Sequence, residues 1–228
     1  MAFNENYQFE SVTEYDIAEP KKYDIKLGAA KKVILSGYRG EKICVRLGSD
    51  TLITLENDFK VKIDDTRNRI DVGVIRKDGV TEAAAKEAVT VYVRIPSPYI
   101  GKIELAADAE TVEVHSLDCD DIEMNLKAQN VLLEDVVGKV EIDCNLDMNV
   151  ICPTINGEIA INQVSASSKI SVPEGAAFTA VAKGVGTSIS YEKNGAPTEA
   201  FDAPGADNII ELNGMKSKLV ICTLAKEV

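Results

Sequence analysis

The chain has 228 residues, 45% of them hydrophobic, which is enough to bury the core of one elongated β domain or of two small domains. Its 37 acidic and 25 basic residues give a formal charge of −12, which repels phosphate backbones, so we expect no nucleic-acid partner. Aromatic residues make up only 5% and Trp is absent, which weighs against the stacking surfaces of many sugar-binding and single-strand-binding proteins.

The N-terminal residues and the cysteines bear on the cellular compartment. Residues 1–8 lack the basic start and apolar run of a secretory signal, and no stretch reaches the roughly 18 apolar residues of a membrane span. The five cysteines are odd in number and widely spaced, which favours reduced thiols over a disulfide framework. We therefore expect a soluble, cytoplasmic protein without a membrane span.

Residues 1–26 are predicted to form an N-terminal extension, followed by one domain over residues 27–228. Alternating segments separated by Gly, Asp and Asn predict irregular strands over residues 27–98. These strands are expected at residues 31–35, 42–47, 51–55, 59–63, 69–75 and 89–95. Residues 81–88 favour helix by composition, but the segment is short, and we interpret it as a loop with one helical turn. Pro96 and Pro98 then interrupt ladder hydrogen bonding.

Regular rungs are predicted over residues 99–175, where the chain repeats about every 18 to 20 residues. The first segment of each unit begins at Lys102, Asp121, Lys139 and Glu158, and the second begins at Val112, Val131, Val150 and Ile170. Two alternating segments with one shared period predict an all-β fold, a single-stranded β-helix or β-solenoid in which each turn of chain stacks on the last.

Alternation within the rungs assigns side chains to faces. From Val140 to Cys152 every even-numbered residue is apolar, so these side chains are predicted to point inward. Cys144 and Cys152 are therefore expected in the core. Like side chains of successive rungs would then stack at about 4.8 Å intervals along one continuous core.

Closing strands are predicted over residues 176–228. Alternating segments at residues 187–191, 208–212 and 218–222 favour strands that cover the last rung. Asn213 and Gly214 stand between the last two, and this dipeptide is typical of a hairpin or tight turn because both residues tolerate positive φ.

One outward position of the rungs is acidic. It is occupied by Glu104, Glu123, Glu141 and Ala160, so three carboxylates are expected to line up on one face. Such a column is mildly repulsive unless solvent or cations screen it. We interpret it as a solvated outer face, with a cation-binding or partner-binding strip as the alternative.

Other chemical motifs are incomplete, and we assign no catalytic, cofactor-binding or metal-binding residue and no cofactor. Residues 145–149 resemble half of a calcium loop, but Val150 and Asn156 replace its Gly and its bidentate Glu, and strand alternation explains the polar positions. The weaker alternatives are a metal site at Asp118, Asp120 and Asp121 and a zinc site or dyad of His115 with Cys119. Residues 183–188 lack the spacing and the Lys placement of a phosphate-binding loop and are expected to form a turn into the following strand. We expect His115, the only histidine, to be a surface residue.

The order of these features resembles one family, the bacterial adhesin-like β-helix domains of unknown function, known under an auto-transporter adhesin label. The resemblance lies in strands such as 59–63 and 91–96 followed by rungs that begin at Gly101, Gly138 and Gly157, and it covers residues 27–228. It implies the scaffold without an activity or a catalytic set. The chain shows no translocation domain of an autotransporter.

The sequence thus favours a non-enzymatic binding or scaffold module that presents a ladder surface to a protein or glycan partner. A polysaccharide-active β-helix enzyme is one alternative, since such enzymes place acids and a basic residue in a groove. A scaffold that polymerises end to end is the other, because exposed solenoid ends can template a further subunit.

Overall fold

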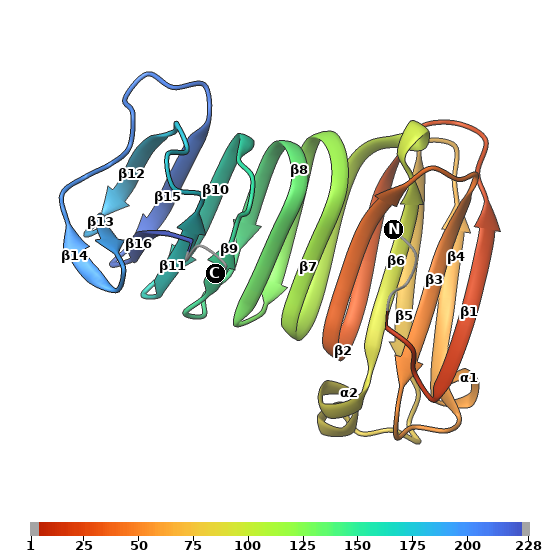
Figure 1. Ribbon diagram of the computed structural model, residues 1–228. Helices are drawn as coiled ribbons and strands as arrows, with labels where there is room; N and C mark the ends of the chain where they lie inside the picture. Colours follow the sequence, from red (N-terminus) through yellow and green to blue (C-terminus); the bar gives the residue numbers. More distant parts are fainter. Residues whose placement is uncertain (1–4, 225–228) are drawn as a thin grey trace.

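The computed structural model describes residues 5–224, and this part of the chain is an all-β protein with one large sheet that does not close on itself. Figure 1 shows the strands standing side by side in one long row, from an N-terminal block in red to yellow to a C-terminal end in blue. No helix in residues 5–224 is long and apolar enough to cross a membrane.

The N-terminal block contains short and irregular elements. They are strands β1 (Phe9–Asp16), β2 (Lys21–Tyr38), β3 (Lys42–Ser49), β4 (Phe59–Asp65), β5 (Arg69–Arg76) and β6 (Thr90–Pro96), with helices α1 (Leu55–Asp58), α2 (Glu82–Ala88) and η1 (Ser97–Tyr99). β1 is antiparallel to β3, β3 to β6 and β4 to β5, whereas β5 and β6 both run parallel to β2. β1 and the start of β2 lie within the predicted extension 1–26 and belong to this sheet.

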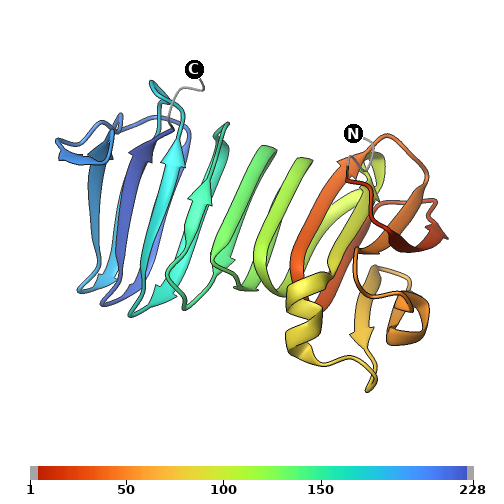
Figure 2. The same ribbon diagram turned by 60° about the horizontal axis from the view of Figure 1, so that its bottom comes forward.

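Two predictions for this block differ from the structure. Residues 51–55 were expected to be a strand, but they form a loop that leads into α1, because Leu55 is buried as the first helical residue rather than paired in a ladder. The helical composition of residues 81–88 yields the two-turn helix α2, whose first turn is capped by Thr81: its hydroxyl accepts a hydrogen bond from the Ala84 amide at 3.1 Å. α2 packs against β2 at the rim of the block (Figure 2).

The repeated segments become neighbouring parallel strands. They are β7 (Ile100–Lys127), β8 (Asn130–Asp143), β9 (Asn149–Ile151), β10 (Asn156–Val164) and β11 (Ser167–Val172). Along one row Val112 lies opposite Val131, Val131 opposite Val150, and Val150 opposite Ile170. These are the residues that the period aligns, so each unit of the sequence pairs with the next unit in the predicted register.

Both ends of the row contain a rung that is out of chain order. The C-terminal strands are β12 (Thr179–Val185), β13 (Ser188–Lys193), β14 (Ala196–Thr198), β15 (Ile209–Met215) and β16 (Lys218–Thr223). β15 lies between β10 and β12, and β16 lies between β11 and β13, so the last two strands are inserted before the pair that precedes them in sequence. At the other end β2 lies between β7 and the pair β5 and β6.

The apolar face of every rung contributes to one continuous core. Val112, Val150 and Ile170 are completely buried, and Cys144 and Cys152 are core residues as predicted. All five cysteines are unpaired thiols in buried positions. Leu146 is an exception to the predicted alternation: residues 144–148 form a corner between β8 and β9 instead of a strand, and its side chain is 46% exposed.

The hairpin predicted at Asn213 and Gly214 is absent. Both residues lie inside β15, which does not pair with β16, and the chain turns afterwards at Lys216, whose φ is +53°. Gly214 is required there for a different reason. A side chain at this position would collide with the backbone carbonyl of Gln163 on the neighbouring rung. The glycine therefore marks close approach between rungs.

Candidate functional site

Four large apolar side chains lie exposed along one corner of the row, and we call them the apolar corner: Leu146, Val164, Met215 and Val185. Val164 lies opposite Met215 on the next strand, and Met215 lies opposite Val185. In each case the next residue has a left-handed backbone, Ser165, Lys216 or Gly186, which turns the chain and leaves the preceding side chain outside the core. Isolated exposed apolar residues are ordinary, whereas an aligned exposed set is a candidate contact surface.

A row of polar side chains runs beside the apolar corner. Asn125, Asp143, Asn162 and Asn213 lie opposite one another on β7, β8, β10 and β15, and we call them the polar row. Asn213 donates its amide to Asn162 Oδ1 at 3.1 Å, and Asn162 donates to Asp143 Oδ1 at 2.9 Å and to Glu141 Oε1 at 2.7 Å. The row is therefore held in place by its own hydrogen bonds.

The polar row and part of the apolar corner line one open cleft of about 650 Å³. The lining contains one cation, Lys127, and one carboxylate, Asp143, so the formal charges in the cleft cancel. This cleft was not predicted from the sequence. One signal for it is present in the sequence: Leu146 and Val164 stand next to small or polar residues, where a chain turn is favoured. The alternating pattern nevertheless assigned Leu146 to the core.

The predicted acidic column is paired with lysines from the same face. Lys22 lies 2.5 Å from Glu104, Lys102 lies 2.6 Å from Glu123, and Lys139 lies 3.4 Å from Glu141, all measured between Nζ and the nearest carboxylate oxygen. Hydrogen bonds to Asp121 and then to Glu123 raise the pKa of Lys102 above its ordinary value. These lysines supply the screening that the column needs, which favours the interpretation as a solvated outer face.

The acidic corner at Asp118, Asp120 and Asp121 does not converge on a cation position. Asp121 is paired with Lys102 at 2.8 Å, while Asp118 lies opposite Val137 in the ladder. Over residues 5–224 no three side chains of the His, Cys, Asp and Glu types are grouped as metal ligands would be.

The polar residues of the calcium-like segment 145–149 serve the backbone. Asn145 Oδ1 accepts a hydrogen bond from the Val164 amide at 2.9 Å, and Asp147 Oδ1 accepts one from the Ser167 amide at 2.6 Å. The explanation by strand alternation holds for Asn149, which begins β9, but was wrong for Asn145 and Asp147, because residues 144–148 form a corner. Its side chains instead replace ladder hydrogen bonds that the missing strand would have supplied.

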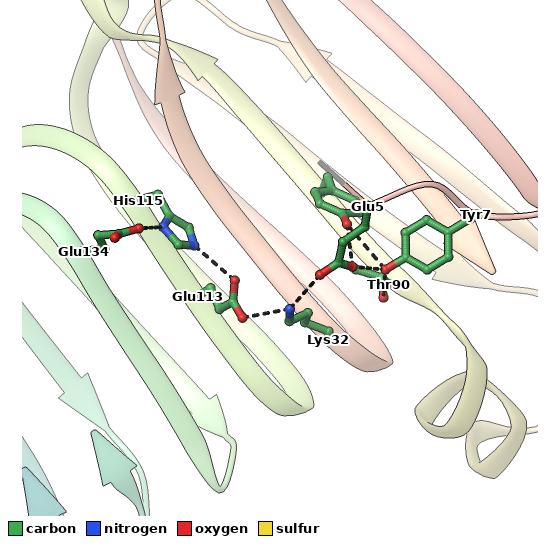
Figure 3. Close-up of polar contacts among 8 residues, drawn as sticks. Glu5, Tyr7, Lys32, Thr90, Glu113, His115 and Glu134 are labelled. Atoms are coloured by element: carbon green, nitrogen blue, oxygen red, sulfur yellow. Dashed lines mark hydrogen bonds and ion pairs between the residues drawn. The ribbon is translucent and has the colours of Figure 1, made fainter. Parts of the chain in front are cut away.

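His115 belongs to a line of charged side chains that crosses three strands and reaches the N-terminal segment (Figure 3). We call it the His115 cluster: Glu134, His115, Glu113, Lys32, Glu5, Tyr7 and Tyr92. His115 Nδ1 lies 2.8 Å from Glu134 and Nε2 lies 3.1 Å from Glu113. Glu113 pairs with Lys32 at 2.8 Å, and Lys32 pairs with Glu5 at 3.1 Å. His115 does point outward as predicted, but the two carboxylates leave only 15% of its side chain exposed.

The pKa shifts in the His115 cluster stabilise its charged pairs. The hydrogen bond from Tyr7, with the Lys32 charge, lowers the pKa of Glu5 to about 2, and the hydrogen bond with His115 lowers the pKa of Glu113. The same contact with Glu113 raises the pKa of His115. Burial raises the pKa of the Tyr7 and Tyr92 hydroxyls, so both stay protonated. Each of these five groups is stabilised in the form that its partner needs.

The remaining sequence candidates have structural partners. Cys119 is not beside His115: its Sγ lies 3.2 Å from the carbonyl oxygen of Gly101, and burial raises the pKa of the thiol. In the segment 183–188, Lys183 lies 2.5 Å from Glu211 and Gly184 packs against the backbone of Gly214. The segment forms the end of β12 and the following corner.

Comparison with known proteins adds distant structural likeness. No protein-family model and no curated protein matches the sequence. A candidate cell adhesion protein from Clostridium sporogenes is 11% identical with a TM-score of 0.43, over 94% of this chain and 100% of that one. A candidate adhesin from Bacteroides fragilis is 12% identical with a TM-score of 0.35, over 95% and 98% of the two chains. A candidate lipid-binding protein from Parabacteroides distasonis is 8% identical with a TM-score of 0.36, over 96% and 98%. Likeness at this level determines neither the function nor the partner of this chain.

Proposed function

We propose that this chain is an adhesin-like β-solenoid that acts as a non-enzymatic binding module and holds its partner at the apolar corner and the polar row. The observation that carries the proposal is the alignment of Val164, Met215 and Val185 at one register position of three adjacent strands. A rung that only needed to fold would gain solubility from polar residues at these exposed positions. Three apolar side chains in line beside a hydrogen-bonded polar row instead provide a contact surface with an apolar centre and a polar edge.

The parallel ladders support the solenoid part of the proposal. Each unit of the repeat lies over the next with like residues opposite one another, and the core is continuous along the row. The five unpaired, buried cysteines fit a reducing compartment, and we retain the cytoplasmic location as part of the proposal.

The enzyme alternative has less support. A polysaccharide-active enzyme needs an acid and a base that converge on one reacting position with shifted pKa values. In the cleft the single carboxylate, Asp143, faces amides. In the His115 cluster the titratable groups are paired with neighbours, and the carboxylates of Glu5 and Glu113 are held in their charged form.

The end-to-end scaffold also has less support, because each end of the row is covered in part by elements other than a parallel rung. At the C-terminal end β14 is antiparallel to β13, and Phe201 packs on Phe178 and Tyr191 with ring centroids 6.1 and 5.1 Å apart. At the N-terminal end β1, β3 and β4 run antiparallel to their neighbours. Such coverings block the addition of a parallel rung.

The test is a binding screen of the full chain against a defined glycan array and a defined peptide library. The double variant Val164→Lys with Met215→Lys charges the apolar corner, and Val12→Lys charges an apolar residue of similar exposure, 54% against 47% for Val164, on β1. We expect a ligand that binds the unmodified chain and the Val12 variant but not the corner variant. Binding that the corner variant retains, or no binding by the unmodified chain, overturns the proposal.

A further inference from the structure

We infer that the cleft at the apolar corner binds a linear, uncharged glycan that lies across the strands. This inference rests on the proposed function and names the ligand class for the same surface. It depends on three properties of the cleft: the spacing of its polar row, the atoms that the row leaves open, and its balanced charge.

The spacing of the polar row suits a chain of sugar rings. Asn125, Asp143, Asn162 and Asn213 recur once per strand, and neighbouring strands lie about 4.8 Å apart. One pyranose unit of an extended glycan has nearly this length, so about one sugar unit lies over each strand of the row. An extended peptide repeats its side-chain direction every two residues, about 6.6 to 6.8 Å, and would lose register within a few strands.

The atoms left open along the row include both hydrogen-bond donors and acceptors. Both donor hydrogens of Asn162 point to carboxylates, those of Glu141 and Asp143, and an amide hydrogen of Asn213 points to Asn162. The carbonyl oxygen of Asn213 and the second oxygen of Asp143 remain open as acceptors, and the Asn125 amide, which makes no side-chain hydrogen bond within residues 5–224, offers a donor as well as an acceptor. Hydroxyl groups are the donors that a glycan supplies at every unit, whereas carboxylate or phosphate ligands carry no donor when ionised.

Charge and apolar area restrict the ligand further. Lys127 and Asp143 cancel within the lining, and the whole chain carries −12, so a polyanion is repelled and the cleft holds no net charge to recruit a polycation. Leu146 and Val164 border the same cleft and provide an aliphatic wall. The C–H faces of pyranose rings pack on such a wall while their hydroxyl edges reach the polar row, so aromatic platforms are dispensable here.

The inference is tested by calorimetric titration of the full chain with linear hexasaccharides. The probes are cellohexaose, xylohexaose and laminarihexaose as uncharged glycans, with hexagalacturonate as the anionic and chitosan hexamer as the cationic counterpart. We expect an uncharged hexasaccharide to bind more tightly than its dimer, because the row spans four strands, and more tightly than either charged probe. Asp143→Ala and Val164→Lys should each weaken this binding about tenfold or more.

The controls separate the ligand class from the surface. Asn149→Ala removes an exposed asparagine of β9 that lies outside the cleft, and it should leave the affinity unchanged. Val164 is exposed, so its variant folds even if Asp143→Ala does not. Peptides or charged glycans that bind at the corner while uncharged glycans do not would overturn the inference and leave the proposed function intact. Uncharged glycans that bind equally to all variants would overturn both.

Discussion

His115 Nδ1 lies 2.8 Å from Glu134 Oε2, and the two residues face each other on adjacent strands, β7 and β8. The contact ties one unit of the repeat to the next at its outer surface. Glu113 binds the other ring nitrogen, so the imidazole is held between two carboxylates. The only histidine of the chain therefore acts as a cross-strand link whose strength depends on its proton.

This link predicts that stability falls as the solution becomes alkaline. Because Glu113 and Glu134 raise the pKa of His115, the folded state keeps its proton more firmly than the unfolded state does. The contribution is complete below the unfolded pKa of about 6.5 and is lost as the pH rises through the folded pKa. We expect the difference in unfolding free energy between the native chain and His115→Gln to be larger near pH 5.5 than near pH 8.5. Urea titrations at both pH values measure it, and an equal difference at both would contradict the expectation.

We predict that adding one methyl group at Gly157 strongly destabilises the fold. Its φ is +124°, and a side chain would collide with the carbonyl oxygen of Gly138 on the neighbouring rung. We expect Gly157→Ala to lower the unfolding free energy by about 3 kcal/mol or more, since strain and collision add. Gly175 is the matched control: its φ is +82° but nothing lies within 4 Å, so Gly175→Ala should cost only about 1 to 2 kcal/mol of backbone strain. Equal losses in the two variants would show that rung contact is not decisive.

We predict that loss of the Phe201 ring, at the C-terminal end of the row, destabilises the chain and promotes self-association. Its ring packs on Phe178 and Tyr191, and Asp202 beside it accepts a hydrogen bond from the Tyr191 hydroxyl at 2.8 Å. Phe201→Ala should lower the unfolding free energy by about 1 to 3 kcal/mol, because the ring is partly exposed. Loosening the cap should also expose β12 and raise the apparent mass in light scattering as concentration increases. A destabilised variant that remains monomeric would show that the loop does not protect this edge.

We predict that removing the charge of Lys102 from the acidic face lowers the stability in a salt-dependent way. It pairs with Asp121 and Glu123, which stand on the neighbouring unit. Lys102→Met leaves these carboxylates to repel each other, and we expect a loss of about 1 kcal/mol at low ionic strength that shrinks toward zero in about 0.5 M salt. Lys193→Met removes a single pair with Glu174 and is the control, with a smaller loss expected. Thermal unfolding across a salt series gives both values, and a salt-independent loss for Lys102→Met would rule out the repulsion.

Local periodicity predicted the contacts between consecutive units but not those between distant segments. Val112, Val131 and Val150 share a period, and the structure places them opposite one another. The pair of His115 and Glu134 follows the same spacing, but nothing else in the sequence marked these two residues as a charged contact. Lys32 and Glu5 lie outside the repeat, so no spacing in the sequence could bring them to Glu113.

The corners were the weakest part of the prediction. Leu146 continues an alternating apolar pattern, but a left-handed turn or a corner interrupts the pleat and moves such a residue outward without a change in composition. The insertion of β15 and β16 was also missed, because their alternation shows that they are strands but not which neighbours they choose.

That insertion makes the order of the strands along the chain differ from their order in the sheet. β7 to β11 pair with strands of the adjacent unit in the sequence. β12 and β13 pair instead with β15 and β16, which follow them in the sequence and are the last strands of the described chain. The cleft lies on this seam, since Asn213 and Gly214 of β15 complete its lining beside Asn162 of β10. The lining of the cleft is therefore complete only when β15 is in place, so a chain truncated before β15 would lack part of the proposed binding surface.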